Sequence, residues 1–450
     1  MRELAKSMLG FSMAMPLLGA QQAASALSPA ARERRRTAEA FDAVTAAAVL
    51  QLGEDSWLHQ LYQFGNCLQN GLIRMGPSLL TPDLLDPGTW LRVSGEVAQR
   101  SAAAGCLLAE DKGGLAWQEL RDKAEVFCLV LDIANLIGVP AEPPFRLCEL
   151  LDRSYGLGPF RALWAVEGLG HEYADSFWKL GIVPSRILSD EGTRELPAKS
   201  LLMLHAGIGL SFAQHCLQGV GAGTPETELR SRVSEILRLC RDNSRPGYLG
   251  AAYESLGLVA RTFHPALVPA VDRAVRDVAP EVLGCYWHGV GRAIFFTAIN
   301  FLPGSDSFVF TMARREAPDE EARRNAVAGA AWAYALVAQR EPRILAELVV
   351  RPYGEELVRD GAFANGVASS SIMRQDTTPD APFLAPFYRY QPDPDDAVLC
   401  RLWQRLVQEP CEEALGRVYP FLKRQGRLDE IFRHQDLGVL AARLGGEEPR

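Results

Sequence analysis

Apolar residues in this chain recur at the spacing of helices. Near the N-terminus, five apolar side chains alternate steps of four and three residues and so share one helix face: Leu4, Met8, Phe11, Met15 and Leu18. Later apolar runs are separated by proline and glycine, and few segments alternate with period two. The run at 308–310 (Phe-Val-Phe) is the best strand candidate. The pattern as a whole predicts an all-α fold.

A repeated phrase runs through the middle of the chain. In four places a proline is followed eight residues later by an acid or a histidine: Pro159 with Glu167, Pro197 with His205, Pro246 with Glu254, and Pro280 with His288. Proline suits the first position of a helix, because its missing N–H needs no partner there. We therefore expect four similar helices, each opened by its proline.

Each polar residue of the repeat is followed at once by a small residue, and soon afterwards by a glycine. Glycine inside a helix costs about 0.5–1 kcal/mol relative to alanine, so its recurrence needs a reason. Two reasons stay open, which are the close approach of neighbouring helices and room for a ligand. The repeat weakens further along, where Ala328 and Asn365 occupy the corresponding positions.

Charged segments lie between the repeated phrases, at 225–239 and 265–278. The phrases themselves are apolar almost all round, which is typical of buried helices. Alternation of buried and charged helices favours an α/α helical-repeat array, either open and curved or closed into a toroid. In a closed array, equal depth after each proline would bring the four polar residues to one level around a common centre.

Three regions follow from this pattern. Residues 1–120 are expected to form a helical N-terminal region, residues 121–385 the α/α repeat domain, and residues 386–450 a C-terminal helical tail. The boundaries rest on Pro/Gly-rich stretches and on the extent of the repeat.

Four residues are candidates for a metal or catalytic site: Glu167, His205, Glu254 and His288. Two glutamates and two histidines from four helices could bind a divalent metal such as iron, manganese, zinc or magnesium. His171 shares a helix face with Glu167 and could contribute. Without a metal, the same groups could act as general acid and base in an apolar cavity. The alternative is that they hydrogen-bond neighbouring helices and fix their register.

Composition narrows the function classes. The chain has 450 residues, of which 48% are hydrophobic and 23% are charged, with a net charge of −8. These values are typical of a globular protein, and no basic face indicates nucleic-acid binding. The nine cysteines are scattered singly and form no CxxC pair. We therefore expect a reducing, cytoplasmic location without a disulfide framework.

The N-terminus has two interpretations. Basic residues before an apolar stretch, and the small residues Ala24-Ser25-Ala26, outline a signal peptide that would be cleaved. The favoured interpretation is an amphipathic helix, which residues 1–36 with their basic run at 34–36 would use to bind a membrane surface or a protein partner. No uncharged apolar stretch of 18 residues occurs, so no transmembrane helix is predicted.

Residues 393–397 read Asp-Pro-Asp-Asp-Ala. The form DxDD resembles the acid motif of class II terpene cyclases, in which the middle aspartate protonates a polyene. That resemblance implies catalytic roles for Asp395 and Asp396, with Asp395 as proton donor. The usual threonine after the motif is replaced by Ala397, and the QxxxGxW repeats of cyclases are absent. The alternative is that these aspartates cap a helix N-terminus.

The phrases WAVEGLG, AAYESLG and YWHGVGRAIFF resemble the E-G-x-G and G-x-G-R-A-x-x-F phrases of a bacterial family of unknown function. Genes of that family lie beside those for enediyne polyketides and related natural products. The resemblance covers roughly residues 145–375 and implies a role in maturing an apolar polyene. It carries no catalytic residues over to this chain.

Together these features give a functional hypothesis. We expect an enzyme of bacterial specialised metabolism that cyclises or isomerises a hydrophobic polyene, terpenoid or polyketide, by acid–base or metal chemistry. The alternative is a non-catalytic scaffold or lipid carrier that docks on a membrane or a partner.

Overall fold

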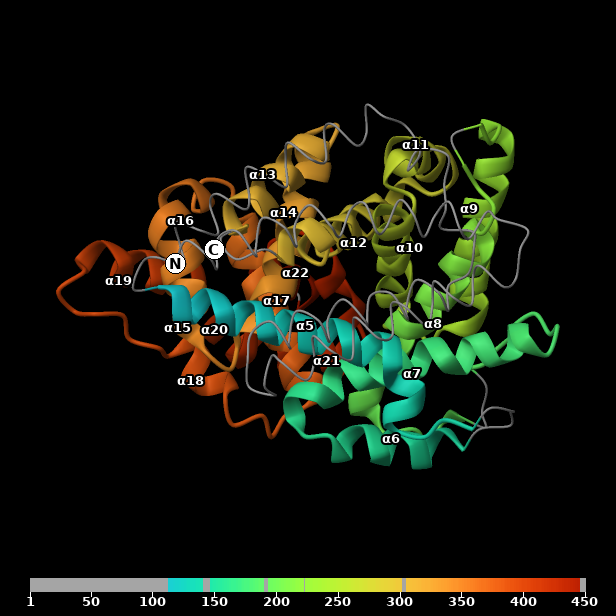
Figure 1. Ribbon diagram of the computed structural model, residues 1–450, viewed down its shortest axis with the longest axis horizontal. Coiled ribbons are helices and arrows are strands. Elements are labelled where there is room, and N and C mark those ends of the chain that lie inside the picture. The colour runs from blue at the N-terminus through green and yellow to red at the C-terminus, as the bar shows by residue number, and fades with distance from the viewer. Residues whose placement is uncertain (1–111, 141–145, 190–192, 222, 302–304, 446–450) are drawn as a thin grey trace, which may run out of the picture. The chain divides into compact units, whose positions relative to one another are not determined.

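The computed structural model describes residues 112–140, 146–189, 193–221, 223–301 and 305–445, and every regular element in these ranges is a helix (Figure 1). The all-α prediction is therefore confirmed. The strand candidate at 308–310 was wrong, because this run lies inside α13 (Asp306–Glu316). There Val309, Phe310 and Ala313 are buried, at spacings that suit one helix face. The predicted N-terminal helix and the signal-peptide alternative lie outside the described residues.

Six apolar helices form the core of the described fold. Each packs against the next in chain order: α7 (Pro159–Lys179), α8 (Leu201–Leu217), α10 (Leu249–Phe263), α12 (Leu283–Phe295), α14 (Glu320–Ala338) and α17 (Ala362–Thr377). Charged, amphipathic helices come between them: α9 (Glu226–Asn243), α11 (Val268–Val278) and α13. The predicted alternation of buried and charged helices is present. Closure into a toroid stays a prediction.

The four prolines of the repeat open their helices in different ways. Only α7 has its proline at the first helical position. Pro197 directly precedes the short 3₁₀ turn η4 (Ala198–Ser200), which leads into α8, and Pro280 opens η6 (Pro280–Val282), which leads into α12. Pro246 lies in a turn before α10, which begins at Leu249. The expectation of a helix-opening proline is thus right for α7 and wrong in detail for the others, because tighter turns precede their α-helices.

The recurrent glycines are explained by close helix approach. A Cβ added to Gly289 of α12 would lie within 3.0 Å of the Glu254 carbonyl oxygen on α10, and one added to Gly257 would meet the Tyr286 carbonyl on α12. Equivalent backbone contacts between successive core helices occur at Gly170, Gly207, Gly209, Gly291, Gly329 and Gly366. The repeat therefore continues structurally into α14 and α17, where its polar residues are lost.

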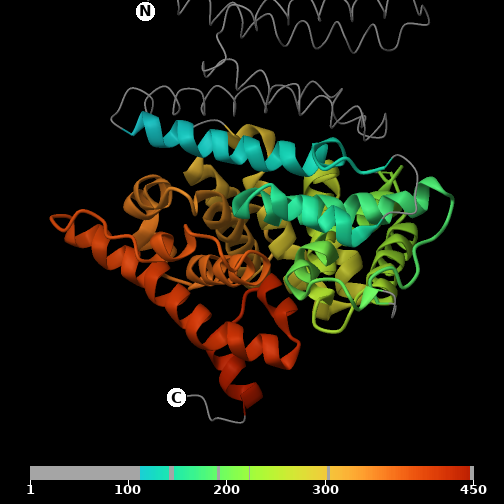
Figure 2. The same cartoon turned by 90° about the horizontal axis from the view of Figure 1, so that it is seen from below.

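Neither predicted domain boundary separates packed units among the described residues. Helix α5 (Gly113–Leu136) runs through the boundary at 120 and packs against α7 and α14. Helix α18 (Leu384–Tyr388) runs through the boundary at 385. Figure 2 shows α5 (cyan) and the C-terminal helices (red) on opposite sides of the core helices. The C-terminal segments contact α10, α12 and α17, so the tail is part of the same core.

The C-terminal helices contain three prolines in their interior. Pro352, Pro410 and Pro420 each follow a five-residue π-helical segment, namely η8 (Ala346–Val350), η9 (Gln404–Gln408) and η10 (Ala414–Val418). Proline lacks an N–H and its ring crowds the carbonyl four residues earlier, so a widened turn lets the helix continue. The helices so joined are α15 (Pro342–Leu345) to α16 (Arg351–Leu357), α19 (Ala397–Trp403) to α20 (Glu409–Glu413), and α20 to α21 (Tyr419–Gln425).

Shorter elements complete the described fold: α6 (Leu147–Gly156), η5 (Pro265–Leu267), η7 (Ala298–Phe301), η11 (Leu428–Phe432) and α22 (Leu437–Gly445). Among the described residues, one helical stretch, Ala198–Leu217, is long and apolar enough to cross a membrane, but 89% of its apolar window is buried inside the protein. Because α7 and α10 cover it, its apolar composition is that of a core helix. Among the cysteines whose side chains the structure describes, the following are free: Cys148, Cys216, Cys240, Cys285, Cys400 and Cys411.

Candidate acid–base site

The structure buries all four polar residues of the repeat. Glu167, His205 and Glu254 are fully buried, and His288 is 1% exposed. Three of them, Glu167, Glu254 and His288, belong to one polar cluster, and His205 lies outside it. The residue that joins the cluster is Arg292 of α12.

Arg292 lies between the two glutamates. Its Nη2 donates to both carboxylate oxygens of Glu167, at 2.6 and 2.5 Å, and its Nη1 donates to Glu254 Oε2 at 3.1 Å. The other oxygen of Glu254 is 2.8 Å from Nδ1 of His288. The cluster thus draws on α7, α10 and α12, and it ties the first core helix to the fourth.

Local sequence explains this convergence. His288 and Arg292 are four residues apart on α12, so they project from one face of the helix. Gly289 follows His288 and lets α12 touch the backbone of α10 at Glu254 itself. The small residue after His288 therefore sets the contact between α12 and α10 at the level of the site. The predicted common level is confirmed for these three polar residues.

Charge balance sets different pKa values for the two glutamates. Burial raises the pKa of both, and Arg292 lowers both. Glu254 also accepts from His288, and its net pKa is lowered. The net pKa of Glu167 is raised, because burial, together with the charge of Glu254, outweighs the effects of Arg292 and of His171. One guanidinium cannot compensate for two buried carboxylates, so Glu167 is the carboxyl that holds a proton more readily.

The metal hypothesis is not supported by this geometry. Over the described ranges, no group of three or more His, Cys, Asp or Glu side chains is arranged to hold a metal ion. A metal bound by Glu167, His205, Glu254 and His288 would need a shared centre, and the guanidinium of Arg292 occupies the space between the glutamates. We correct that assignment to a carboxylate–guanidinium cluster.

His205 has a structural role instead. Its Nδ1 donates to the Leu201 carbonyl at 2.6 Å, and its Nε2 accepts from the Arg245 backbone N–H at 3.0 Å. The ring also stacks on Tyr248. Burial lowers the pKa of His205 to about 4, so the ring is neutral and both nitrogens are used. It fixes the turn before α10 against α8, which is the register role that the sequence left open.

An apolar pocket of about 110 Å³ adjoins the cluster. Glu167 and Arg292 line it, and the rest of the wall is mostly apolar, with side chains from α5, α7, α8, α10 and α12 that include Val130, Trp164, Leu210, Leu258 and Phe296. An apolar pocket with a few convergent polar groups is the usual form of a small-molecule site. Neither Glu254 nor His288 lines the pocket, so they act behind it.

Aromatic rings surround the far side of the cluster. The Arg292 guanidinium lies 4.9 Å from the ring centre of Trp332, and the His288 ring meets Trp332 and Phe432 edge-on. Phe432 comes from η11, in the segment predicted to be a separate tail. In the part of the chain that the structure describes, His288 Nε2 and Arg292 Nε have no hydrogen-bond partner. The cluster therefore keeps two polar atoms that its own residues do not satisfy.

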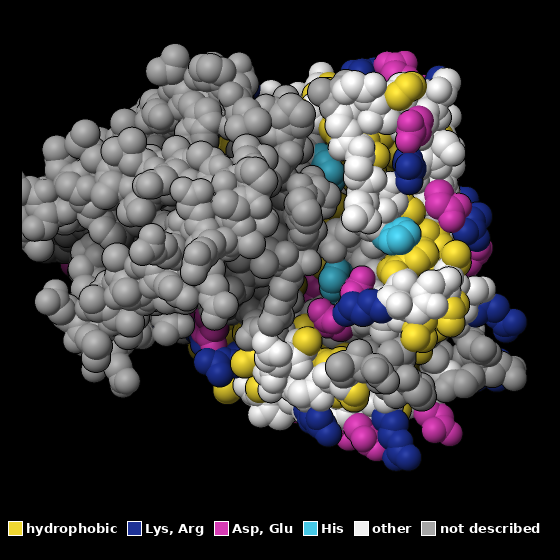
Figure 3. Space-filling model, turned by 45° about the vertical axis from the view of Figure 1, so that its right-hand side comes forward, with side chains coloured by type: hydrophobic (Ala, Val, Ile, Leu, Met, Phe, Trp, Pro, Cys, Tyr) yellow, Lys and Arg dark blue, Asp and Glu magenta, His cyan; other side chains and the backbone are white. Residues whose placement is uncertain are grey.

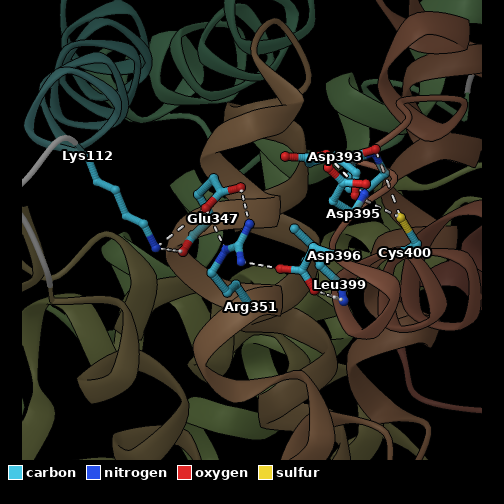
Figure 4. A network of polar contacts seen from close by, with 9 residues as sticks. Lys112, Glu347, Arg351, Asp393, Asp395, Asp396, Leu399 and Cys400 are labelled. Atoms are coloured by element: carbon cyan, nitrogen blue, oxygen red, sulfur yellow. Dashed lines mark hydrogen bonds and ion pairs between the residues drawn. The ribbon is translucent and has the colours of Figure 1, made fainter.

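The aspartates of the DxDD motif lie at the surface (Figure 4). Asp396 caps α19 by accepting from the Leu399 N–H at 2.9 Å, and it pairs with Arg351. Asp395 is exposed, and its backbone N–H donates to Asp393 Oδ1 at 3.1 Å. An acid that protonates a polyene needs an enclosed, apolar setting. The catalytic assignment is therefore corrected: Asp396 caps α19, and Asp395 is an exposed residue of the turn before that helix.

Arg292 was not among the site residues predicted from the sequence. A signal was present, because Arg292 stands four residues after His288 and within the G-x-G-R-A phrase. On the described part of the face in Figure 3, acidic and basic side chains are interspersed.

Comparisons of the chain with models of protein families, with curated proteins and with solved structures found no match.

Proposed function

We propose that the protein is an enzyme that moves a proton on a hydrophobic polyene, with Glu167 as the acid and base. One observation carries this proposal. A fully buried carboxyl with a raised pKa lines an apolar pocket, beside a guanidinium that stabilises its charged form. Its raised pKa lets the carboxyl hold a proton more readily than a free glutamate does, and Arg292 stabilises the carboxylate once the proton has left.

The reaction is an isomerisation that needs no oxidant or reductant. Glu167 gives its proton to one carbon of a double bond, whose electron pair forms the new C–H bond and leaves a cation on the next carbon. A neighbouring carbon then returns a proton to the Glu167 carboxylate, and its C–H electrons form the shifted double bond. If a second double bond attacks the cation first, the same proton balance gives a ring. Trp164 and Phe296, which line the pocket, offer ring faces to the cation.

The other residues of the cluster position these groups. Arg292 holds the Glu167 carboxylate after it has lost its proton, and Glu254 with His288 holds Arg292. The pocket volume of about 110 Å³ is well below the roughly 300–1,000 Å³ of pockets that enclose a whole drug-sized ligand. The substrate therefore places one end in the pocket. The resemblance to a natural-product family supports a terpenoid or polyketide chain in bacterial specialised metabolism.

A second candidate is a carrier that only stores an apolar molecule. It is favoured by the contacts of Arg292, whose two Nη nitrogens already satisfy both glutamates. A pocket that only binds an apolar molecule needs the charged groups in its lining to be paired, because an unpaired buried charge is costly.

The test compares the native protein with Glu167→Gln. Purified protein is incubated with squalene, with geranylgeraniol and with cis-parinaric acid, a fluorescent polyene fatty acid, and products are separated by chromatography. We expect a product that Glu167→Gln forms at least about 100-fold more slowly. Parinaric acid should bind to both proteins with affinities within about threefold, because the amide keeps the shape of the carboxyl. Glu172→Gln, on the same helix but outside the pocket lining, is the matched control.

Three results are informative. Equal product formation by Glu167→Gln would contradict the role of Glu167. Binding without any product would favour the carrier. Neither binding nor product with any of the polyenes would overturn the proposed ligand class.

A further inference from the structure

A second buried arginine lies apart from the acid–base cluster. Arg374 of α17 is fully buried. Its Nε donates to Gln339 Oε1 at 2.8 Å, and its Nη1 donates to the Pro159 carbonyl at 2.8 Å. Its Nη2, within the described part of the chain, has no hydrogen-bond partner. Arg374 thus joins the last core helix to the start of the first, with one donor nitrogen left over.

The charge of Arg374 is uncompensated. No carboxylate of the described residues forms an ion pair with it, and its guanidinium lies 5.6 and 5.2 Å from the ring centres of Phe160 and Phe383. The charged neighbour that acts on it is another arginine, Arg340. Burial, with a smaller effect from Arg340, lowers the pKa of Arg374 to about 9. A buried cation normally has a counter-ion, because removing it from water is otherwise costly.

A neighbouring amide supplies a second unused donor. Gln339 follows the end of α14, is 1% exposed, and leaves its Nε2 without a partner among the described residues. The bond from Arg374 Nε to Gln339 Oε1 fixes which atom of the amide is the nitrogen. Two buried donors, one of them on a cation, therefore come from side chains that are already bonded to each other.

We propose that Arg374 and Gln339 bind a small monovalent anion, either chloride or the carboxylate of a small acid. A single anion would accept from Arg374 Nη2 and Gln339 Nε2 and would balance one positive charge. A dianion fits less well, because Nη2 of Arg340 is already engaged by Asp122 and Glu125 at 2.6 Å each. Bound there, the anion would stabilise the contact between α17, α14 and the start of α7.

This site is independent of the proposed reaction. Arg374 bonds to α7 at Pro159, eight residues before Glu167, which is about 12 Å along a helix axis. Failure of the polyene hypothesis would leave the anion site untouched, and the converse also holds.

The experiment measures thermal unfolding of the full chain in sodium chloride, sodium formate and sodium gluconate at equal ionic strength. Gluconate is the bulky reference that a buried site excludes. We expect 100 mM chloride or formate to raise the Tm of the native protein by about 2 °C or more relative to gluconate. A rise with chloride alone or with formate alone identifies which anion the site accepts. Equal Tm values in the three salts would overturn the proposal.

Three variants keep the test specific. Gln339→Glu places a carboxylate beside Arg374 Nε, so its Tm in gluconate should rise and its response to chloride and formate should disappear. Gln218→Glu makes the same change at an exposed position and should keep the native response. An anion response that persists in Gln339→Glu would place the effect elsewhere and overturn the assignment. Gln339→Met, which removes the donor without adding charge, should also abolish the response.

Discussion

At the scale of single residues, Arg292 is the group on which the cluster depends. It lies between Glu167 and Glu254, and all three are at least 97% buried. Replacing it with methionine leaves two carboxylates in the core without a cation. We expect Arg292→Met to lower the free energy of unfolding by about 3–5 kcal/mol, as when a buried ion pair loses one partner. Denaturant unfolding monitored by tryptophan fluorescence measures this.

The matched control is Arg238→Met. Arg238 also contacts two carboxylates, Glu235 and Asp242, but its side chain is 47% exposed, so the loss should be at most about 1 kcal/mol. Adding Glu167→Gln and Glu254→Gln to Arg292→Met should recover part of the stability, because the unpaired charges are then gone. Equal effects of Arg292→Met and Arg238→Met would contradict the assigned burial of charge.

Asp306 is a second buried acid, and its raised pKa predicts that the stability of the protein depends on pH. Burial, with Glu119 nearby, raises the pKa of Asp306 from 3.8 to about 8, against the effects of Lys123 and of the Tyr334 hydroxyl, which donates at 2.6 Å. Between these pKa values the folded state holds a proton that the unfolded state has released. Asp306 therefore makes stability fall as pH rises from about 4 to about 8, by up to about 1.4 kcal/mol per pH unit.

The measurement compares denaturant unfolding of the native protein and of Asp306→Asn at pH 5, 6, 7 and 8. The amide keeps an acceptor for Tyr334 and cannot titrate, so the variant should become progressively more stable than the native protein as pH rises. Tyr334→Phe removes the donor that lowers the folded-state pKa of Asp306, so stability should fall with the same slope but continue to fall to a higher pH. Parallel pH profiles for native protein and Asp306→Asn would show that Asp306 does not hold the proton.

At the scale of helices, the glycines set the spacing between core elements. Gly289 faces the Glu254 carbonyl so closely that any side chain there would overlap backbone. Alanine is normally the better helix former by about 0.8–1 kcal/mol. We nevertheless expect Gly289→Ala to destabilise the protein by about 2 kcal/mol or more, because backbone atoms must move apart. Chemical denaturation of the variant measures the sign and the size.

Gly416→Ala is the control for that substitution. Gly416 is helical and exposed, and a Cβ added there meets no atom within 4 Å. It should leave stability unchanged or raise it by up to about 1 kcal/mol. If Gly289→Ala were also neutral or stabilising, close approach would not be the reason for the glycine.

The sequence predicted correctly which segments form the core helices, but it did not predict correctly where those helices begin. Apolar periodicity and glycine recurrence identified the core helices, because burial imposes both on the local sequence. It did not separate α-helical starts from 3₁₀ turns at Pro197 and Pro280, because proline suits both. It also took 308–310 for a strand, because a three-residue apolar run carries no period of its own.

At the scale of the whole described fold, long-range contacts escaped prediction. Arg292 reaches Glu167 across 125 positions, and Phe432 packs on His288 from a segment assigned to a separate tail. Nothing in the spacing around Glu167 specifies an arginine partner so distant in the chain. The four polar residues were correctly placed in the core, but the choice between metal, acid–base and structural roles depended on which of them meet. His205 is an example: it follows its proline by eight residues, as the other three polar residues do, but it lies outside the cluster around Arg292.

The central claim is that Glu167 moves a proton on an apolar substrate, and deuterium transfer tests it most directly. The polyene that is turned over is incubated with native protein and with Glu167→Gln in D₂O, and the product is analysed by mass spectrometry. Glu167 exchanges its proton with solvent before reaction, so the native product should be about one mass unit heavier, and Glu167→Gln should form essentially none. A labelled product formed at the native rate by Glu167→Gln would contradict the account.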